Sequence, residues 1–186
     1  QPSGQLVLSD VRKGRNMSGL AQGQIKKLLV LEQLPKPVNF SGGQDTLSYL
    51  GSFNLERILG TVPVEADGSA CFVLPADRPV FYVALDENDL SVRRMQSFTS
   101  VRPGETVSCV GCHDSRTHVE TRGGDTTHLQ ALQRPASMIE PVPGVAAVPD
   151  FQRDVQPVLD RHCVRCHGGP EGMGGLNPLR HASAEM

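Results

Sequence analysis

The sequence is poor in aromatic residues and lacks the long apolar runs that membrane helices require. It contains no Trp, and Phe, Trp and Tyr together make up 4% of its 186 residues. No apolar run approaches the roughly 20 residues that cross a bilayer, so we expect no transmembrane segment. The formal net charge is −2, which provides no basic surface for phosphate groups. Nucleic acid is therefore not an expected partner.

Signatures of several enzyme classes are also missing. The sequence has no nucleophile triad, P-loop or dinucleotide-binding fingerprint. An acidic group formed by Asp86, Glu87 and Asp89 offers oxygen ligands of the kind that Ca²⁺ prefers. The group follows an apolar run, so our preferred interpretation is a solvated strand end.

The sequence does contain two copies of Cys-x-x-Cys-His, at residues 109–113 and 163–167. This spacing is typical of covalent c-type haem attachment, because two thiols add across the porphyrin vinyl groups and the adjoining His binds the iron. The sequence therefore predicts two covalently attached haem c groups. The attachment residues are Cys109, Cys112, Cys163 and Cys166, and the proximal iron ligands are His113 and His167.

Zinc is the main alternative for the four motif cysteines, which would then form a split four-thiolate site. Zinc ribbons separate their two cysteine pairs by about 15–20 residues, whereas 50 residues intervene here. Zinc also gives no reason for a His after each pair. Disulfides are a third alternative, although a two-residue gap suits redox-active pairs better. Haem attachment would leave only Cys71, which we interpret as a small buried apolar residue.

The sixth iron ligand decides between electron transfer and catalysis, because two strong axial ligands leave no position for a substrate. His128 follows a glycine-containing loop and is our preferred distal ligand for the first haem. His162 directly precedes the second motif, so it would have to reach the other haem. His181 and Met173 are candidates for the second haem, while His118 is interpreted as a surface residue.

The remaining pattern predicts a mainly β fold followed by a small α-helical module. Apolar runs at residues 25–31, 58–64, 70–74 and 80–85, separated by turn residues, favour an antiparallel sandwich. Asp67-Gly68 between two of these runs predicts a hairpin. A helix starting at Asp154, with Pro157 in its first turn, leads into the second motif.

We expect three segments along the chain. Residues 1–107 form the sandwich-like domain, 108–148 carry the first haem attachment and a Pro-rich connector, and 149–186 form a short cytochrome c-like module. Only 19 residues follow His167, so we expect cover for the second haem to come from another subunit or a second copy. Haem is attached outside the bacterial cytoplasm. The start at Gln1, without initiator Met or signal peptide, is typical of a processed segment, so we expect the periplasm or an equivalent lumen.

Several stretches resemble one bacterial family. Residues 25–32, 60–64, 84–87 and 103–113, together with 154–159 leading into the second motif, are similar to the middle and C-terminal haem regions of hydrazine synthase alpha subunit-like multihaem c-type cytochromes of planctomycete-type bacteria. This resemblance implies a β-domain with the first haem, a cytochrome c domain with the second, and redox chemistry of small nitrogen compounds.

The sequence departs from that family in one respect. In hydrazine synthase itself, a Tyr shortly after the first motif binds the iron, whereas here residues 114–118 contain no Tyr. The two tyrosines, Tyr49 and Tyr82, lie far upstream in the sequence. We therefore prefer a dihaem electron-transfer protein that works with other redox proteins or subunits. A haem oxidoreductase and a self-assembling cytochrome are the alternatives.

Overall fold

The computed structural model describes residues 2–14, 17–34, 56–95, 97–111 and 128–167. These residues form a mainly β structure with two sheets, followed by short helical segments, which confirms the predicted fold class at this level. The chain divides into two compact units, Gln1–Pro143 and Gly144–Met186. No helix within the described ranges is long and apolar enough to cross a membrane.

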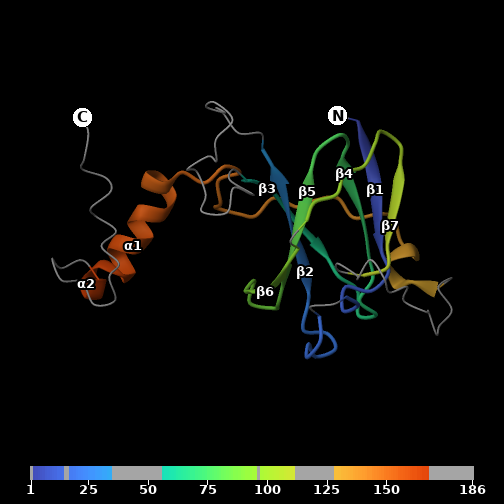
Figure 1. The fold of residues 1–186 in the computed structure, drawn as a ribbon, viewed down its shortest axis with the longest axis horizontal. Coiled ribbons are helices and arrows are strands. Elements are labelled where there is room, and N and C mark those ends of the chain that lie inside the picture. Colours follow the sequence, from blue (N-terminus) through green and yellow to red (C-terminus); the bar gives the residue numbers. More distant parts are fainter. Residues whose placement is uncertain (1, 15–16, 35–55, 96, 112–127, 168–186) are drawn as a thin grey trace. The chain divides into compact units, whose positions relative to one another are not determined.

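The first unit contains two sheets (Figure 1). The three-stranded sheet has the order β4 (Ala70–Pro75), β1 (Ser3–Leu8) and β7 (Thr106–Cys109). The four-stranded sheet has the order β3 (Glu56–Pro63), β2 (Lys27–Gln33), β5 (Val80–Leu85) and β6 (Ser91–Arg94). All strand pairs are antiparallel except β1 with β7, which is parallel. The two sheets are therefore mostly antiparallel, as predicted, with one parallel pair.

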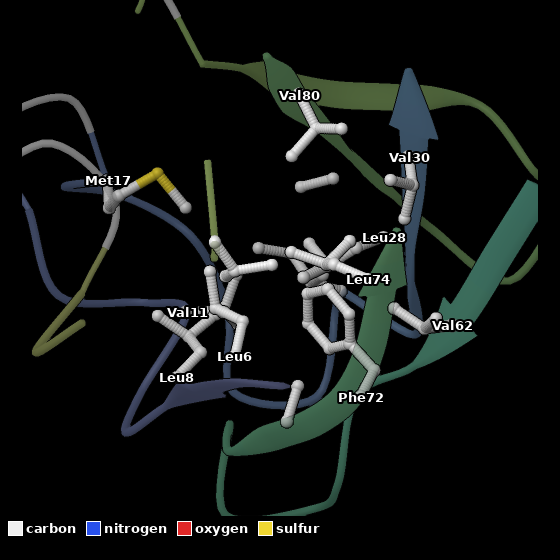
Figure 2. Packing of buried hydrophobic residues seen from close by; sticks show 14 residues of the cluster. Leu6, Leu8, Val11, Met17, Leu28, Val30, Val62, Phe72, Leu74 and Val80 are labelled. Atoms are coloured by element: carbon white, nitrogen blue, oxygen red, sulfur yellow. The ribbon is translucent and has the colours of Figure 1, made fainter. Parts of the chain in front are cut away.

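The core lies between the two sheets, where alternate side chains of each strand meet. Leu6 of β1 and Phe72 of β4 pack in one buried cluster with Leu28 of β2 and Val62 of β3. Figure 2 shows these side chains converging from both sheets. Burying such side chains contributes about 1.5–3 kcal/mol each, so this layer is the main source of stability of the unit.

Strand β5 is apolar on both faces, which explains its unbroken run of apolar residues. Val80 and Ala84 belong to the inter-sheet cluster, whereas Phe81, Val83 and Leu85 form a second buried cluster on the opposite face of the same sheet. The guanidinium of Arg94 lies 4.8 Å from the Phe81 ring centroid, a distance typical of a cation–π contact.

The predicted hairpin at Asp67-Gly68 is wrong, although the turn itself is present. The backbone N–H of Gly68 donates to the Glu65 carbonyl at 2.9 Å, and Gly68 has a positive φ of 86°. The flanking strands β3 and β4 then enter different sheets. A turn signal in sequence marks the reversal of the chain but not the partner of each strand, which the packing of the apolar faces decides.

The Pro-rich segment after residue 134 is extended and closes the β3/β4 edge of the first unit. Ser137 forms backbone hydrogen bonds with Cys71 and Val73 of β4, and Glu140 forms two with Thr61 of β3. Edge strands present unpaired N–H and C=O groups, so this segment covers the edges of both sheets at once.

The second unit contains a π-helical turn, η3 (Phe151–Val155), followed by α1 (Gln156–His162) and α2 (Val164–His167). Pro157 lies in the first turn of α1 as predicted. The predicted N-cap at Asp154 is wrong, because Asp150 caps the helical segment and accepts a hydrogen bond from the backbone N–H of Arg153 at 2.8 Å. The π-helical turn lengthens the segment by one turn before the predicted start.

Gly60 is the position where the closing segment approaches β3 most closely. A Cβ atom at Gly60 would lie 2.1 Å from the Glu140 carbonyl oxygen, and φ is +138°. We expect Gly60→Ala to lower the free energy of unfolding by about 2–4 kcal/mol, since it combines backbone strain with overpacking. Urea unfolding measures this loss.

Gly104→Ala is the matched control, because Gly104 also has a positive φ but its added Cβ would meet nothing within 4 Å. It should cost only the backbone strain, about 1–2 kcal/mol. Equal losses in the two variants would contradict the docking of residues 135–143 against β3.

Candidate functional site

The first Cys-x-x-Cys-His motif begins at the end of β7, where it continues the parallel ladder with the chain that follows β1. The backbone N–H of Ser9 donates to the Cys109 carbonyl at 2.9 Å, and that of Asp10 donates to the Val110 carbonyl at 3.2 Å. The first three residues of the motif are thus held against residues 9–13. Cys112 and His113, which complete the motif, lie outside the described residues.

Gly111 is required at the third position of the motif because the backbone of Lys13 lies against it. An added Cβ would be 2.2 Å from the Lys13 carbonyl oxygen. Any larger residue must displace the backbone at one of these two positions. The close approach therefore fixes how the motif leaves the sheet.

A set of ionic and polar contacts stiffens the segment that holds the motif. The Arg12 guanidinium donates to both carboxylate oxygens of Asp10, at 2.8 and 3.0 Å, and to the Asp67 carbonyl at 2.8 Å. The hydrogen bond with Asp10 raises the pKa of Arg12, so the cation is retained at every physiological pH. The bidentate pair with Asp10 stiffens the loop after β1, and the bond to the Asp67 carbonyl ties this loop to the β3–β4 turn.

The β3–β4 turn also holds residues 130–132, which follow the first motif in the chain. Asp67 accepts hydrogen bonds from the Ser69 hydroxyl at 2.6 Å and from the backbone N–H of Gln130 at 2.9 Å. Burial opposes ionisation of Asp67, but these hydrogen bonds outweigh it and lower the pKa. The short 3-10 helix η2 (Gln130–Leu132) is thereby fixed against β4.

A small pocket with a cavity volume of about 50 Å³ lies beside the first motif. Strands β1, β2, β5, β6 and β7 all contribute to its wall, so it is set between the two sheets at the edge formed by β6 and β7. Its lining is almost entirely apolar apart from three side chains, those of Tyr82, Arg93 and Thr99. Cys109 and Gly111 belong to the lining, so the motif starts at the pocket wall.

Tyr82 was not expected to act at this site, because it lies far from the first motif along the chain. It lies on β5 and lines the pocket together with Cys109. Its hydroxyl oxygen is buried and has no hydrogen-bond partner among the described residues. Burial raises the pKa of Tyr82 well above its usual range, with a further contribution from nearby Cys109. Packing of the sheet that contains β5 against the sheet that contains β7 places these two residues together, and no local sequence signal could have indicated it.

The residue types that line the pocket suit contact with a haem attached through Cys109, but the cavity itself is too small to enclose one. Burial raises the pKa of the Cys109 thiol, so the sulfur sits in apolar surroundings suited to a thioether. Core residues Leu6, Leu8 and Leu28 supply the apolar wall that a porphyrin face requires.

The second motif occupies the junction of α1 and α2. The backbone N–H of Cys163 donates to the Leu159 carbonyl at 2.8 Å, and that of Cys166 donates to the Cys163 carbonyl at 3.1 Å. Cys163 is partly buried and Cys166 is exposed. One turn of chain thus presents both thiols, and His167 follows at the end of α2.

The unit around the second motif leaves apolar side chains uncovered. Helix α1 has no buried residue among those described. Phe151, Val155 and Val158 are 51%, 37% and 56% exposed. Side chains of this kind are the ones that a haem or a neighbouring chain would cover.

The predicted distal ligands are only partly described by the structure. His128 is exposed, next to η2, and is not part of the pocket lining; His162 is exposed at the end of α1. The other candidates, Met173 and His181, lie outside the described residues, as does His118, which was interpreted as a surface residue. All of these assignments stay predictions.

Two other expectations concern cysteine and calcium. Cys71 is buried in β4, and burial raises its pKa, as expected for a small apolar residue. Asp86 accepts hydrogen bonds from the backbone N–H groups of Asn88 and Leu90, and Asp89 pairs with Lys27 at 2.8 Å. Within the described part of the chain, no group of three or more His, Cys, Asp and Glu residues is arranged to hold a metal ion.

Comparisons with known proteins agree on one family. A family model described as the hydrazine synthase alpha subunit middle domain matches residues 23–114. Hydrazine synthase subunit alpha of Kuenenia stuttgartiensis is 25% identical over 185 residues, an alignment that covers 72% of this chain and 23% of that protein. The chain therefore spans about a quarter of the length of that relative.

The fold comparison gives the same result. The solved structure of Kuenenia stuttgartiensis hydrazine synthase matches with a TM-score of 0.65 at 20% identity, covering 94% of this chain and 31% of that chain. At this identity the match concerns the fold. The predicted resemblance to the hydrazine synthase alpha subunit is confirmed.

Gly111→Ala tests the contact that positions the first motif. We expect it to lower the free energy of unfolding by about 1–3 kcal/mol, because a methyl group cannot fit against the Lys13 backbone. Val110→Ala alters the neighbouring motif position, whose side chain is 40% exposed, and should change stability by no more than about 0.5 kcal/mol. Denaturant unfolding of both variants checks the difference, and a neutral Gly111→Ala would refute the contact.

Asp154 lies in η3, the π-helical turn that precedes α1. Its titration tests how the start of this helical segment is held. Its carboxylate accepts hydrogen bonds from the Arg153 side chain and from the backbone N–H of Asp150, which lower its pKa to about 2. The stabilisation is therefore complete above the unfolded-state pKa of about 3.9 and is lost as the pH falls through 2. NMR titration of the Asp150 amide should show a midpoint near 2.

Asp154→Ala should abolish that titration and fray the start of the segment. Asp160→Ala is the control, because Asp160 accepts its hydrogen bond from the Gln156 side chain and not from the backbone. A midpoint near 4 for the Asp150 amide would show that the carboxylate is not engaged.

Proposed function

We propose, on the premise that this chain resembles the hydrazine synthase alpha subunit, that it is a dihaem c-type protein that transfers electrons within a larger redox complex. The first haem is attached through Cys109 and Cys112 with His113 as proximal ligand. The second is attached through Cys163 and Cys166 with His167 as proximal ligand. The observation that carries the proposal is the position of Cys109 in the wall of an apolar pocket.

The chain's own residues have defined tasks in this proposal. Leu6, Leu8 and Leu28 exclude water from one side of the pocket. Residues 9–13 fix the direction in which the first motif leaves β7. A bound haem supplies one-electron iron chemistry, and its potential depends on axial ligands, hydrogen bonds and burial. The apolar wall favours the less charged ferrous state and so raises the potential of the first site.

Catalysis by the first haem is the second candidate function. Hydrazine synthase is named in both comparisons. In this alternative, which rests on that likeness, the chain is a haem oxidoreductase subunit that acts on small nitrogen compounds. Binding of CO, NO or cyanide to the first haem would favour catalysis, while two strong axial ligands would favour electron transfer.

We also propose an extracytoplasmic location, in the periplasm or an equivalent lumen, and other redox subunits as partners. The support for partners is the group of exposed apolar side chains around α1 in the second unit. Self-association of this chain is the alternative source of cover. A mass that rises with protein concentration would favour self-association.

Haem counting tests the proposed function. The protein should contain two covalent haems per chain by pyridine haemochrome assay. Cys109→Ala/Cys112→Ala and Cys163→Ala/Cys166→Ala should each lose one, since each motif supplies its own two thioethers. Cys71→Ala changes a buried cysteine outside both motifs and should retain both. A colourless wild-type protein that contains zinc would overturn the proposal.

A further inference from the structure

The cavity beside the first motif is far smaller than a haem. Its volume is about 50 Å³, whereas sites that enclose a drug-sized ligand measure about 300–1,000 Å³. Its floor consists of core side chains that are at most 6% exposed, namely Leu6, Leu8, Val11, Leu28 and Ala84. A haem could enter only by displacing this close-packed layer, which holds the two sheets together. The structure therefore leaves room for the macrocycle only outside the sandwich.

The start of the motif is fixed beside this cavity. The Cys109 carbonyl accepts a hydrogen bond from the backbone N–H of Ser9 at 2.9 Å, and the Val110 carbonyl accepts one from that of Asp10 at 3.2 Å. Cys109 itself is partly buried in the lining. A porphyrin bonded to its sulfur therefore begins at the cavity and extends over the neighbouring surface.

The outer part of the lining forms a partly exposed rim, which consists of Arg93, Met95, Thr99, Cys109 and Gly111. A Met side chain adapts its shape to an apolar surface. The Arg guanidinium presents a planar fork of N–H donors that matches a carboxylate. Apolar contact beside one cation is the combination that suits a porphyrin carrying propionate groups.

Arg93 and its neighbour Arg94 differ in the face of the sheet on which they lie, because successive side chains of a strand alternate. Arg93 lines the cavity and donates a hydrogen bond to the Val92 carbonyl at 2.9 Å, one of the five donors of a guanidinium. Arg94 lies over the Phe81 ring on the opposite face and pairs with Glu56. Among the described residues that line the cavity, Arg93 is the one cation.

We propose that the haem attached at Cys109 lies across the mouth of the cavity, outside the sandwich, and that Arg93 pairs with one of its propionates. The inference rests on the proposed function, which supplies the haem. Arg93 is then a positioning residue that also places a positive charge beside the haem. Ferrous haem carries one positive charge less than ferric haem, so a nearby cation favours the ferrous state and raises the midpoint potential.

The test uses the full chain with Cys163→Ala/Cys166→Ala, so that the first motif alone carries haem. Arg93→Gln and Arg93→Lys are each added to this background. Arg94→Gln is the matched control, because it removes the same charge from the adjacent position on the other face of the sheet. Haem per chain is counted in every variant, and the midpoint potential is measured by spectroelectrochemistry.

We expect Arg93→Gln to keep its haem and to lower the midpoint potential by more than Arg94→Gln does. Arg93→Lys retains the charge and should restore most of the loss. A general loss of stability would affect Arg94→Gln at least as much, since Arg94 holds both an ion pair and a cation–π contact. Equal shifts in the two Gln variants, or no shift in either, would overturn the pairing with Arg93.

NMR line broadening by the ferric haem locates the macrocycle independently of any change at Arg93. The haem-free reference is the same chain with Cys109→Ala/Cys112→Ala. We expect the amide of Thr99 on the rim to be broadened most, that of Leu28 in the floor less, and that of Thr61 at the β3/β4 edge least. Stronger broadening at Leu28 than at Thr99 would show an enclosed haem and overturn the inference. If the parent chain carries no haem at the first motif, the proposed function fails instead.

Discussion

The parallel pairing of β1 with β7 is the constraint on which the candidate site depends. It joins the N-terminal strand to a strand about 100 residues later, with Leu8 opposite Cys109. The ladder continues past both strands through the hydrogen bonds of Ser9 and Asp10, and Gly111 fits only because it has no side chain. Long-range pairing of this kind costs loop-closure entropy, which the packing of Leu6 and Leu8 into the core offsets.

The sandwich has two open edges. A later segment of the chain covers one of them, and the pocket lies at the other. At the β3/β4 edge, residues 135–143 cover both sheets through backbone hydrogen bonds. At the β6/β7 edge, the described residues leave a mostly apolar pocket that reaches the core. An apolar pocket open to water is costly, so an occupant that fills it stabilises the unit.

The two motifs are presented in different ways. The first leaves a strand at the wall of a pocket, whereas the second spans the junction of two short helices whose apolar side chains are exposed. Burial and axial ligation set haem potentials, so two haems in such different surroundings would have different potentials. That difference suits directional electron transfer, and it equally suits a division into one reactive and one electron-supplying haem.

The motifs, the mainly β character and the family resemblance could all be predicted from the sequence, because each depends on local spacing or on alternation of apolar residues. The partner of each strand could not, since the Asp67-Gly68 turn joins strands of different sheets. Nor could the N-cap, because Asp150 and Asp154 both offer a carboxylate and only the helix geometry selects Asp150. Tyr82 lies 27 positions before Cys109 in the sequence, yet both line one pocket. The sequence determined which residues carry the chemistry, and tertiary packing decided which of them meet, because register and sheet order bring distant side chains together.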